Sequence, residues 1–406
     1  MKDQRPTLAG RLTRKMLVWL VLLALVIAGI IFYLEGRATR EFYTEIYHNK
    51  MLITYEYTRR VISDVYVAVT NNVFYLEQSL DKPDSHKLTM ERIVKNGTRI
   101  RSCGISFIAD YYPEKGHRFC PFAWRNENNP EVIYSEDMGD ADLDYLKSDW
   151  FNDIIESDSA QWSEPFYDGY DEKTPLSAYE VPIHDKDGRT VAVLGADLSL
   201  DWLTDKLAEM DSILNDNGML MASKFGLRSN SFIIFQDGRY ITHADQKRIM
   251  KDNFFGHVES VDGSDVKGLL SNMRAGVARE DRYQEKFAVD GEECYVFYTP
   301  IKYSHWLMVT VVPCRAVDML GIINGAAMFL IVVVAMLIII FLGYFYIKNG
   351  FKPMTLLTKS VNDMADGKFD TSMPELKHND EISELRDAIE RLQYTASNVA
   401  EKKEKK

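Results

Sequence analysis

Two long stretches of the chain contain no charged residue. The first covers residues 16–34, the second covers residues 319–347, and both consist mostly of Leu, Val, Ile, Ala and Met. At about 1.5 Å of rise per residue, a helix of the shorter length roughly matches a hydrocarbon layer about 30 Å thick. The pattern therefore predicts two transmembrane helices. A cleaved signal peptide is the alternative for the first stretch, but its apolar core is long and no A-x-A site follows it.

Between the two stretches, the pattern predicts one long helix followed by two α/β modules. Residues 35–80 contain no proline and place apolar residues at helical spacing, which predicts a stalk helix. Short β-type runs then alternate with turn residues, and a helix is expected over residues 201–217. Turn residues that predict three hairpins are Asp185 to Gly188, Asp237-Gly238 and Asp290-Gly291.

After the second stretch, apolar residues follow a heptad pattern in two short blocks. One block has 3-4-3 spacing and the other continues it as 3-4-3-4-3; the residues are Met354, Leu357, Val361 and Met364, then Ile382, Leu385, Ile389, Leu392, Ala396 and Val399. Two such helices cannot bury their apolar seams alone. Two copies of the chain together form a parallel four-helix bundle, so we expect a homodimer.

The predicted fold class is an α/β (α+β) membrane protein with distinct segments. In chain order they are an N-terminal flank (1–15), a transmembrane helix (16–34), a stalk helix (35–80), a membrane-distal module (81–200), a linker helix (201–230), a membrane-proximal module (231–317), a second transmembrane helix (319–347), a helical relay (348–400) and a charged tail (401–406).

The distribution of charge predicts an orientation. The net charge is -12, which argues against nucleic acid as a partner. Basic residues nevertheless flank both apolar stretches on one side: Lys2, Arg5, Arg11, Arg14 and Lys15 before the first, and Lys348, Lys352 and Lys359 after the second. Because cytoplasmic flanks carry the excess of Lys and Arg, both termini are expected in the cytoplasm and residues 35–318 outside the inner membrane.

The four cysteines fall in or at the edge of the predicted outer region, where oxidation is permitted. Cys294 and Cys314 are equidistant from a turn near residue 304, and Cys103 and Cys120 flank a similar loop. This spacing predicts two disulfides, Cys103–Cys120 and Cys294–Cys314. Four buried free thiols are the alternative.

A segment of the outer region carries a distinctive motif set. It includes Trp150-Phe151 at the start of a helix, the element Phe166-x-Asp168, and a strand that ends in Gly195-Ala196-Asp197-Leu198. With the order of helix, two modules and second span, these motifs resemble the double Cache (dCache) extracytoplasmic sensors of bacteria. The resemblance covers residues 35–317 and implies two PAS-like modules, with a small-molecule ligand held in the membrane-distal one.

The resemblance also implies a binding site in that module. Its predicted ligand-binding residues are Trp150, Phe151, Phe166, Asp168, Tyr179 and Asp197. Amino-acid-binding members use an Arg to grip the ligand carboxylate, and Ser148 stands at that position here. Without the bidentate guanidinium clamp, the remaining carboxylates and rings favour an amine-bearing or a neutral ligand.

The helical relay resembles a HAMP domain. The resemblance rests on Pro353 after the span, the connector residue Gly367, and the start Asp380-Glu381-Ile382 of the second helix, where Ser383 replaces the usual glycine. An amphipathic hairpin lying on the membrane is the alternative, although such helices carry more basic residues on their polar face.

Candidate chemistry for an enzyme is sparse, and we expect neither catalysis nor a cofactor nor a metal. The eight His residues are scattered, and Asp140, Asp142 and Asp144 begin an EF-hand-like run that lacks its glycine and its final glutamate. The sequence thus predicts a sensor subunit that signals through the relay, with a separate cytoplasmic output protein as its partner. The alternatives are an adhesion or scaffold protein, or the sensor half of a truncated chemoreceptor, histidine kinase or protein phosphatase.

Overall fold

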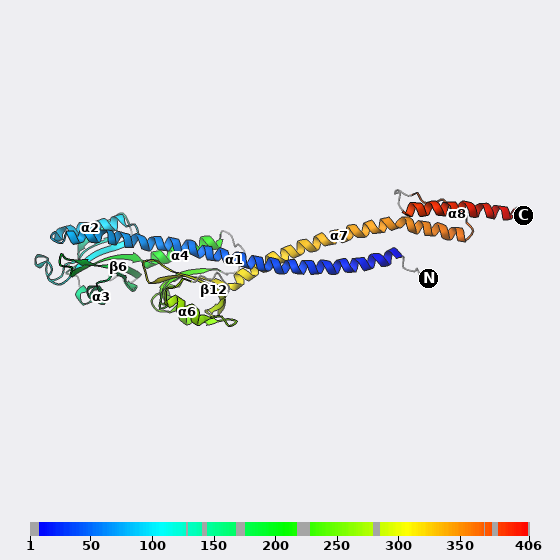
Figure 1. The fold of residues 1–406 in the computed structure, drawn as a ribbon. Helices are drawn as coiled ribbons and strands as arrows, with labels where there is room; N and C mark the ends of the chain where they lie inside the picture. The colour runs from blue at the N-terminus through cyan, green and yellow to red at the C-terminus, as the bar shows by residue number, and fades with distance from the viewer. Residues whose placement is uncertain are drawn as a thin grey trace. The chain divides into compact units, whose positions relative to one another are not determined.

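The computed structural model describes residues 8–126, 129–139, 144–167, 175–216, 228–278, 285–368, 370–375 and 381–404 (Figure 1). The chain divides into two compact units. One unit is Thr39–Leu320, and the other combines Met1–Ala38 with Gly321–Lys406. The fold is mixed α/β with two sheets and two long helices that carry the apolar stretches, as the hydrophobic pattern predicts.

The unit with both chain ends contains the apolar parts of α1 (Leu8–Gln78) and α7 (Cys314–Ala365). Each helix is long and apolar enough to cross a membrane, and residues such as Trp19 and Phe341 expose most of their side chains. Glycines let the two backbones approach each other. A Cβ atom on Gly321 would lie 3.2 Å from the carbonyl oxygen of Gly36, so a larger residue would push the helices apart.

The first module of the other unit is an antiparallel sheet in the order β3-β2-β1-β7-β6-β4, with β5 also paired to β6. Its strands are β1 (Ile100–Phe107), β2 (Pro121–Arg125), β3 (Ile133–Asp137), β4 (Gln161–Trp162), β5 (Phe166–Tyr167), β6 (Pro175–His184) and β7 (Thr190–Ser199). Helices α1 and α2 (Pro83–Asn96) cover one face, and α3 (Asp149–Ser157) contacts the other.

The second module is also an antiparallel sheet, in the order β10-β11-β12-β13-β8-β9. Its elements are β8 (Asn230–Phe235), β9 (Tyr240–Thr242), β10 (Val258–Ser260), α6 (Val266–Arg274), β11 (Lys286–Val289), β12 (Glu292–Pro300) and β13 (Trp306–Pro313). The core of the first module continues into this sheet through Trp306 and Met308. One face of the second sheet therefore joins the core of the first module, while its other face packs against a separate apolar cluster that includes Phe232, Phe254 and Phe287.

All three predicted hairpin turns are present. The turns join β6 to β7, β8 to β9 and β11 to β12. Gly188, Gly238 and Gly291 adopt positive φ angles of 77°, 95° and 80°. Only glycine reaches this left-handed region without steric cost, so these residues fix where each strand reverses.

The predicted disulfides are not formed, and all four thiols are free and buried. Successive residues of a strand point to opposite faces of a sheet. Cys103 belongs to the core on the α2 side, 3.6 Å from the Met90 sulfur, whereas Cys120 lies on the α3 side with its sulfur 3.2 Å from Ser106 Oγ. Cys294 pairs across the ladder with Pro313, so Cys314 falls one residue out of register and joins a different cluster. The alternative of buried free thiols is the observed state.

A buried polar node lies where α1, the helix α4 (Leu200–Asp216) and the second sheet meet. Lys50 of α1 is only 5% exposed and donates to Ser229 Oγ at 3.1 Å. Asp211 of α4 accepts from the backbone N–H of Ser231 at 2.6 Å and from its hydroxyl at 2.8 Å. Burial raises the pKa of Asp211, and Lys50 acts in the opposite direction.

The relay region contains the end of α7 and the helix α8 (Glu381–Glu404). Pro353 lies inside α7. Gly367 has a φ of +81° directly after the helix, and its N–H donates to the carbonyl oxygen of Met364, which ends α7 with a left-handed cap. The heptad residues Leu357 and Ile389 are buried, whereas Leu392 is exposed.

Candidate ligand-binding site

The α3 face of the first sheet carries two rows of side chains that the strand register aligns. The first row runs across five strands and contains Tyr134, Trp124, Ser102, Asp197 and Ala178. The second row contains Glu136, Phe122, Gly104, Gly195 and Glu180. Directly opposed residues of an antiparallel ladder point to the same face, so the register alone places aromatic rings beside carboxylates.

The centre of this face has no side chains because Gly104 and Gly195 oppose each other on β1 and β7. The Phe122 ring covers Gly104 so closely that an added Cβ would lie 2.6 Å from Cδ2. At Gly195, in contrast, an added Cβ would meet only Glu180 Cγ, at 3.9 Å. The sheet is therefore open above Gly195, next to the carboxyl groups of Glu180 on the facing strand and Asp197 on the same strand.

Asp197 is the carboxylate of the first row. It is half-buried on β7 and accepts a hydrogen bond of 2.5 Å from Ser102 Oγ on β1. On the other side of Ser102, the rings of Trp124 and Tyr134 lie 5.7 Å apart, and those of Phe122 and Trp124 lie 6.0 Å apart. These rings form an aromatic strip next to the anionic group.

Glu180 is the carboxyl group of the second row, and it is 4% exposed. Within the described part of the chain, its Oε2 has no hydrogen-bond partner. Burial raises the pKa of Glu180 to about 8, and the charges of Asp197 and Asp153 add to the effect. A buried polar atom without a partner is uncommon in folded proteins and points to a group that completes the site.

The predicted site residues of α3 have separate environments. Phe151 is buried against Tyr145, with ring centroids 5.3 Å apart, in the cluster that joins α3 to Val193 of β7. Trp150 is half-buried and packs against the same cluster. Both residues help to hold α3 over the sheet.

The remaining predicted site residues do not assemble as expected. Tyr179 pairs with Ala196 and so points to the α1 side, where its ring contacts Tyr66 and Trp162 at 5.3 and 5.4 Å. The expectation that Tyr179 lines the same cup as Asp197 is therefore wrong, because adjacent strand residues alternate between faces. Phe166 is 37% exposed on β5, and Asp168 lies outside the described residues.

Four residues of the α3 face were missed in the sequence: Ser102, Phe122, Trp124 and Glu180. The signal was present as alternation. Phe122 and Trp124 are two residues apart in one strand, as are Ala178 and Glu180 in another, so each pair lies on one face. Asp197 pairs with Ala178 and therefore shows which of the two faces carries the site. Strand pairing had to be known before these residues could be combined.

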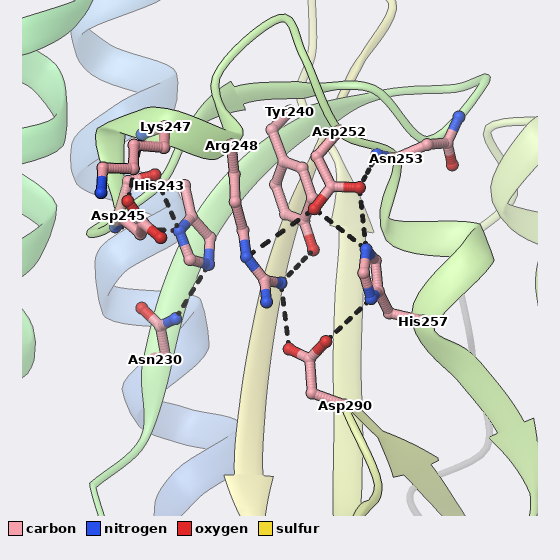
Figure 2. A network of polar contacts seen from close by, with 10 residues as sticks. All are labelled: Asn230, Tyr240, His243, Asp245, Lys247, Arg248, Asp252, Asn253, His257 and Asp290. Carbon is pink, nitrogen blue, oxygen red and sulfur yellow. Dashed lines mark hydrogen bonds and ion pairs between the residues drawn. The ribbon is translucent and has the colours of Figure 1, made fainter.

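A second polar cluster lies in the other module and has a different character (Figure 2). His257 contacts both Asp252 and Asp290, each at 2.8 Å. Arg248 approaches the same two carboxylates, at 3.8 Å and 3.0 Å. The bond from His257 lowers the pKa of Asp252. Cationic or hydrogen-bonding partners from the module itself therefore surround both of these carboxylates.

A groove with a cavity volume of about 360 Å³ lies on the opposite side of the first module. It is bordered by α1, α2 and the turn before β1, with Asn71, Arg92 and Arg99 among its lining residues. Arg99 already stacks on Trp202, 4.4 Å from the ring centroid. We place the candidate site on the α3 face because Glu180, which is 4% exposed and whose Oε2 has no partner within the described residues, lies there.

Residues 87–205 match the family model described as the first PDC sensor domain of methyl-accepting chemotaxis protein-like proteins. This segment is therefore similar to PDC sensor domains. It contains both rows of the α3 face and α3 itself. A search among curated protein sequences finds no significant match.

Solved structures show a similar fold. The extracellular domain assigned to the histidine kinase soHK1S-Z6 is 16% identical, with a TM-score of 0.51 and coverage of 71% of this chain and 98% of that domain. The periplasmic domain of the Campylobacter jejuni chemoreceptor Tlp1 is 13% identical, with a TM-score of 0.48 and coverage of 65% and 92%. The ligand-binding domain of Pseudomonas aeruginosa PctB with L-Arg is 15% identical, with a TM-score of 0.43 and coverage of 66% and 94%.

Proposed function

We propose that the chain is a membrane-anchored sensor whose PDC domain binds a small molecule through an ammonium group. The observation that supports this most directly is the pair of aligned rows, which put Glu180 opposite Gly195 and Asp197 two residues further along the same strand, next to an open glycine surface. An ammonium group placed there would gain ion pairing and hydrogen bonds. The neighbouring aromatic strip would add cation–π attraction.

The character of the ligand follows from what the site lacks. Ser148, the residue directly before α3, supplies no guanidinium where the dCache resemblance implies one. Among the described residues, a free carboxylate on the ligand would then face the negative charge of Asp197 without a guanidinium to offset it, which is unfavourable at short range. A simple amine therefore suits the site better than an α-amino acid.

The covalent path from the site supports a relay role. Strand β7, which carries Asp197, is followed without a loop by α4, and α4 reaches the buried node at Asp211. Strand β13 borders that node through Thr310 and continues directly into α7. Binding that favours one arrangement of β7 would thereby bias α7.

We further propose that the last part of α7 and the helix α8, from two copies of the chain, pack together as a HAMP bundle. The left-handed cap at Gly367 and the burial of Leu357 and Ile389 support this arrangement. The two apolar helices would anchor the chain in the inner membrane with both termini in the cytoplasm. The protein would act without catalysis and would signal to a cytoplasmic output partner.

A thermal-shift screen of the purified full chain in detergent tests the ligand proposal. The panel contains amines, amino acids and small carboxylates at matched concentrations. We expect amines to raise the unfolding midpoint, Asp197→Asn to remove the shift, and Glu156→Gln, at an exposed acid of α3, to keep it. If carboxylates but not amines stabilise the protein, the proposed site is wrong. If nothing does, the scaffold alternative is favoured.

A protease-protection experiment tests the orientation separately. Protease added to intact spheroplasts should digest the unit Thr39–Leu320 and spare an epitope placed after α8. Protection of the sensor unit under conditions where a known periplasmic protein is cleaved would refute the proposed topology.

A further inference from the structure

Glu180 occupies an unusual position for a carboxyl group. It lies in the middle of β6 and only 4% of its surface is exposed. Its Oε2 has no hydrogen-bond partner within the described residues. Its cross-strand neighbour on β7 is Gly195, and Gln161 lies opposite it on β4. Neither neighbour carries a charge, so the strand ladder offers no counter-ion.

Among the described residues, the titratable groups that act on Glu180 are both acids. Asp197 reaches it from β7 and Asp153 from α3, and both disfavour its ionised form. Without a cation in the site, an ionised Glu180 would add a buried negative charge beside those of Asp153, which is exposed, and Asp197, which is half-buried. The neutral carboxylic acid is therefore the form that the empty site accepts near neutral pH.

An incoming ammonium group reverses this balance. Placed above Gly195, it would lie next to both Glu180 and Asp197 and would supply the counter-charge that the ladder lacks. Resting on the proposed amine-binding function, we propose that Glu180 is a second anchor for the ammonium group and gives up its proton to solvent when that group docks.

The exchange balances in atoms and charge. The O–H bond of Glu180 breaks heterolytically, the electron pair stays on the carboxylate, and the proton passes to buffer. The ammonium group keeps all of its hydrogens. The site gains one positive charge and loses one, so its net charge is unchanged. A sensor of this kind responds jointly to the amine and to the external pH.

Two measurements on the full chain in detergent test the exchange, with propylamine as the probe. Infrared difference spectra of wild type against Glu180→Gln report whether a protonated carboxyl group is present in the empty protein. Calorimetric titrations in buffers of different ionisation enthalpy count the protons released on binding. Gln keeps the size and shape of the neutral acid, so Glu180→Gln should fold.

The proposal expects a carboxylic acid band in the wild type near neutral pH that is absent from Glu180→Gln and that propylamine removes. Close to one proton should be released for each propylamine bound. At pH values below the pKa of Glu180, the affinity for propylamine should therefore increase as the pH is raised, by up to about tenfold per pH unit. The variant should bind with little pH dependence and release no proton.

Other outcomes separate the two proposals. Binding without proton release, or an empty protein without the band, overturns the exchange and leaves the amine site intact. A band that propylamine does not affect, together with the absence of binding heat, overturns the amine site and the exchange with it. If Asp197→Asn binds propylamine as tightly as the wild type, the ammonium group does not dock next to Asp197 and Glu180, and the exchange is also refuted.

Discussion

The two modules of the unit Thr39–Leu320 differ in what surrounds their acidic groups. In the second module, Asp252 and Asp290 are shared between Arg248 and His257, and the nearby Asp211 is buried with Lys50 beside it. In the first module, Glu180 Oε2 has no partner among the described residues, and the described charged groups that act on Glu180 are the acids Asp197 and Asp153. The second module thus supplies partners for its own carboxylates, whereas the described part of the first module supplies no cation to Glu180.

This difference separates a binding surface from a structural one. A polar network that is satisfied internally makes a module rigid and gains nothing from a ligand. An unsatisfied buried group costs stability, and a ligand that completes it recovers that cost. Of two similar sheets in one unit, one can therefore provide a ligand-binding surface while the other provides a rigid structural module.

The largest expected effect is at the buried node. Lys50→Met should reduce the free energy of unfolding by about 3 kcal/mol, because Ser229 loses its buried hydrogen bond to Lys50 and the positive charge that favours ionised Asp211 is removed. Urea unfolding of the full chain in detergent, followed by tryptophan fluorescence, measures this loss. The double variant Lys50→Met with Asp211→Asn should recover part of it; a loss equal to the sum of both single changes would show that the two groups do not interact.

The next effect concerns pH and the first module. Glu180 has a folded pKa of about 8, above its usual value of 4.5, so its contribution to stability is complete below about pH 4.5 and is lost as pH rises toward 8. Wild type should therefore lose about 1.4 kcal/mol per pH unit relative to Glu180→Gln across this window. Parallel unfolding curves at about pH 5.5 and pH 7.5 test this, and an unchanged difference between the two proteins would contradict it.

The second module should have the opposite dependence on pH. The pKa of Asp252 is lowered, so its contribution is present above its usual range and is lost as pH falls. Arg248→Met should cost about 1–2 kcal/mol at neutral pH, a reduced value because the pair is partly exposed. The exposed turn pair provides the control: Arg189→Met should change stability by less than about 0.5 kcal/mol. If Arg248→Met and Arg189→Met reduce the free energy of unfolding equally, the cluster of Arg248, Asp252, His257 and Asp290 stabilises the protein no more than an exposed ion pair does.

The smallest effect compares two glycines. Gly195→Ala meets only an ordinary contact and should stabilise the strand by about 0.5 kcal/mol while it weakens amine binding. Gly104→Ala should destabilise the protein instead, because the new methyl group collides with Phe122. Thermal midpoints with and without propylamine distinguish the two. Stronger binding by Gly195→Ala would place the ligand away from this surface.

The sequence predicts the features that depend on local pattern. The uncharged stretches become the apolar parts of α1 and α7, and the three predicted hairpins close at their glycines. Each of these elements is determined by residues close together in the chain, through hydrophobic periodicity or the left-handed conformation of a turn.

The errors all concern strand register and faces. Equal spacing around a turn suggested that Cys294 and Cys314 meet, but the ladder pairs Cys294 with Pro313. Tyr179 and Glu180 are adjacent, and the one that was chosen for the site points to the other side of the sheet. A shift of one residue exchanges the two faces of a strand, and only long-range pairing decides between them.

The junction between β13 and α7 has a further consequence for how insertions would be tolerated. Pro313 ends the strand and Cys314 begins the helix, so no loop residue can absorb a change in length. One extra residue at this junction would turn every later position of α7 by about 100°, while four extra residues would turn it by little more than a full revolution. Natural length variation at this point should therefore follow the pitch of the helix rather than the flexibility of a tether.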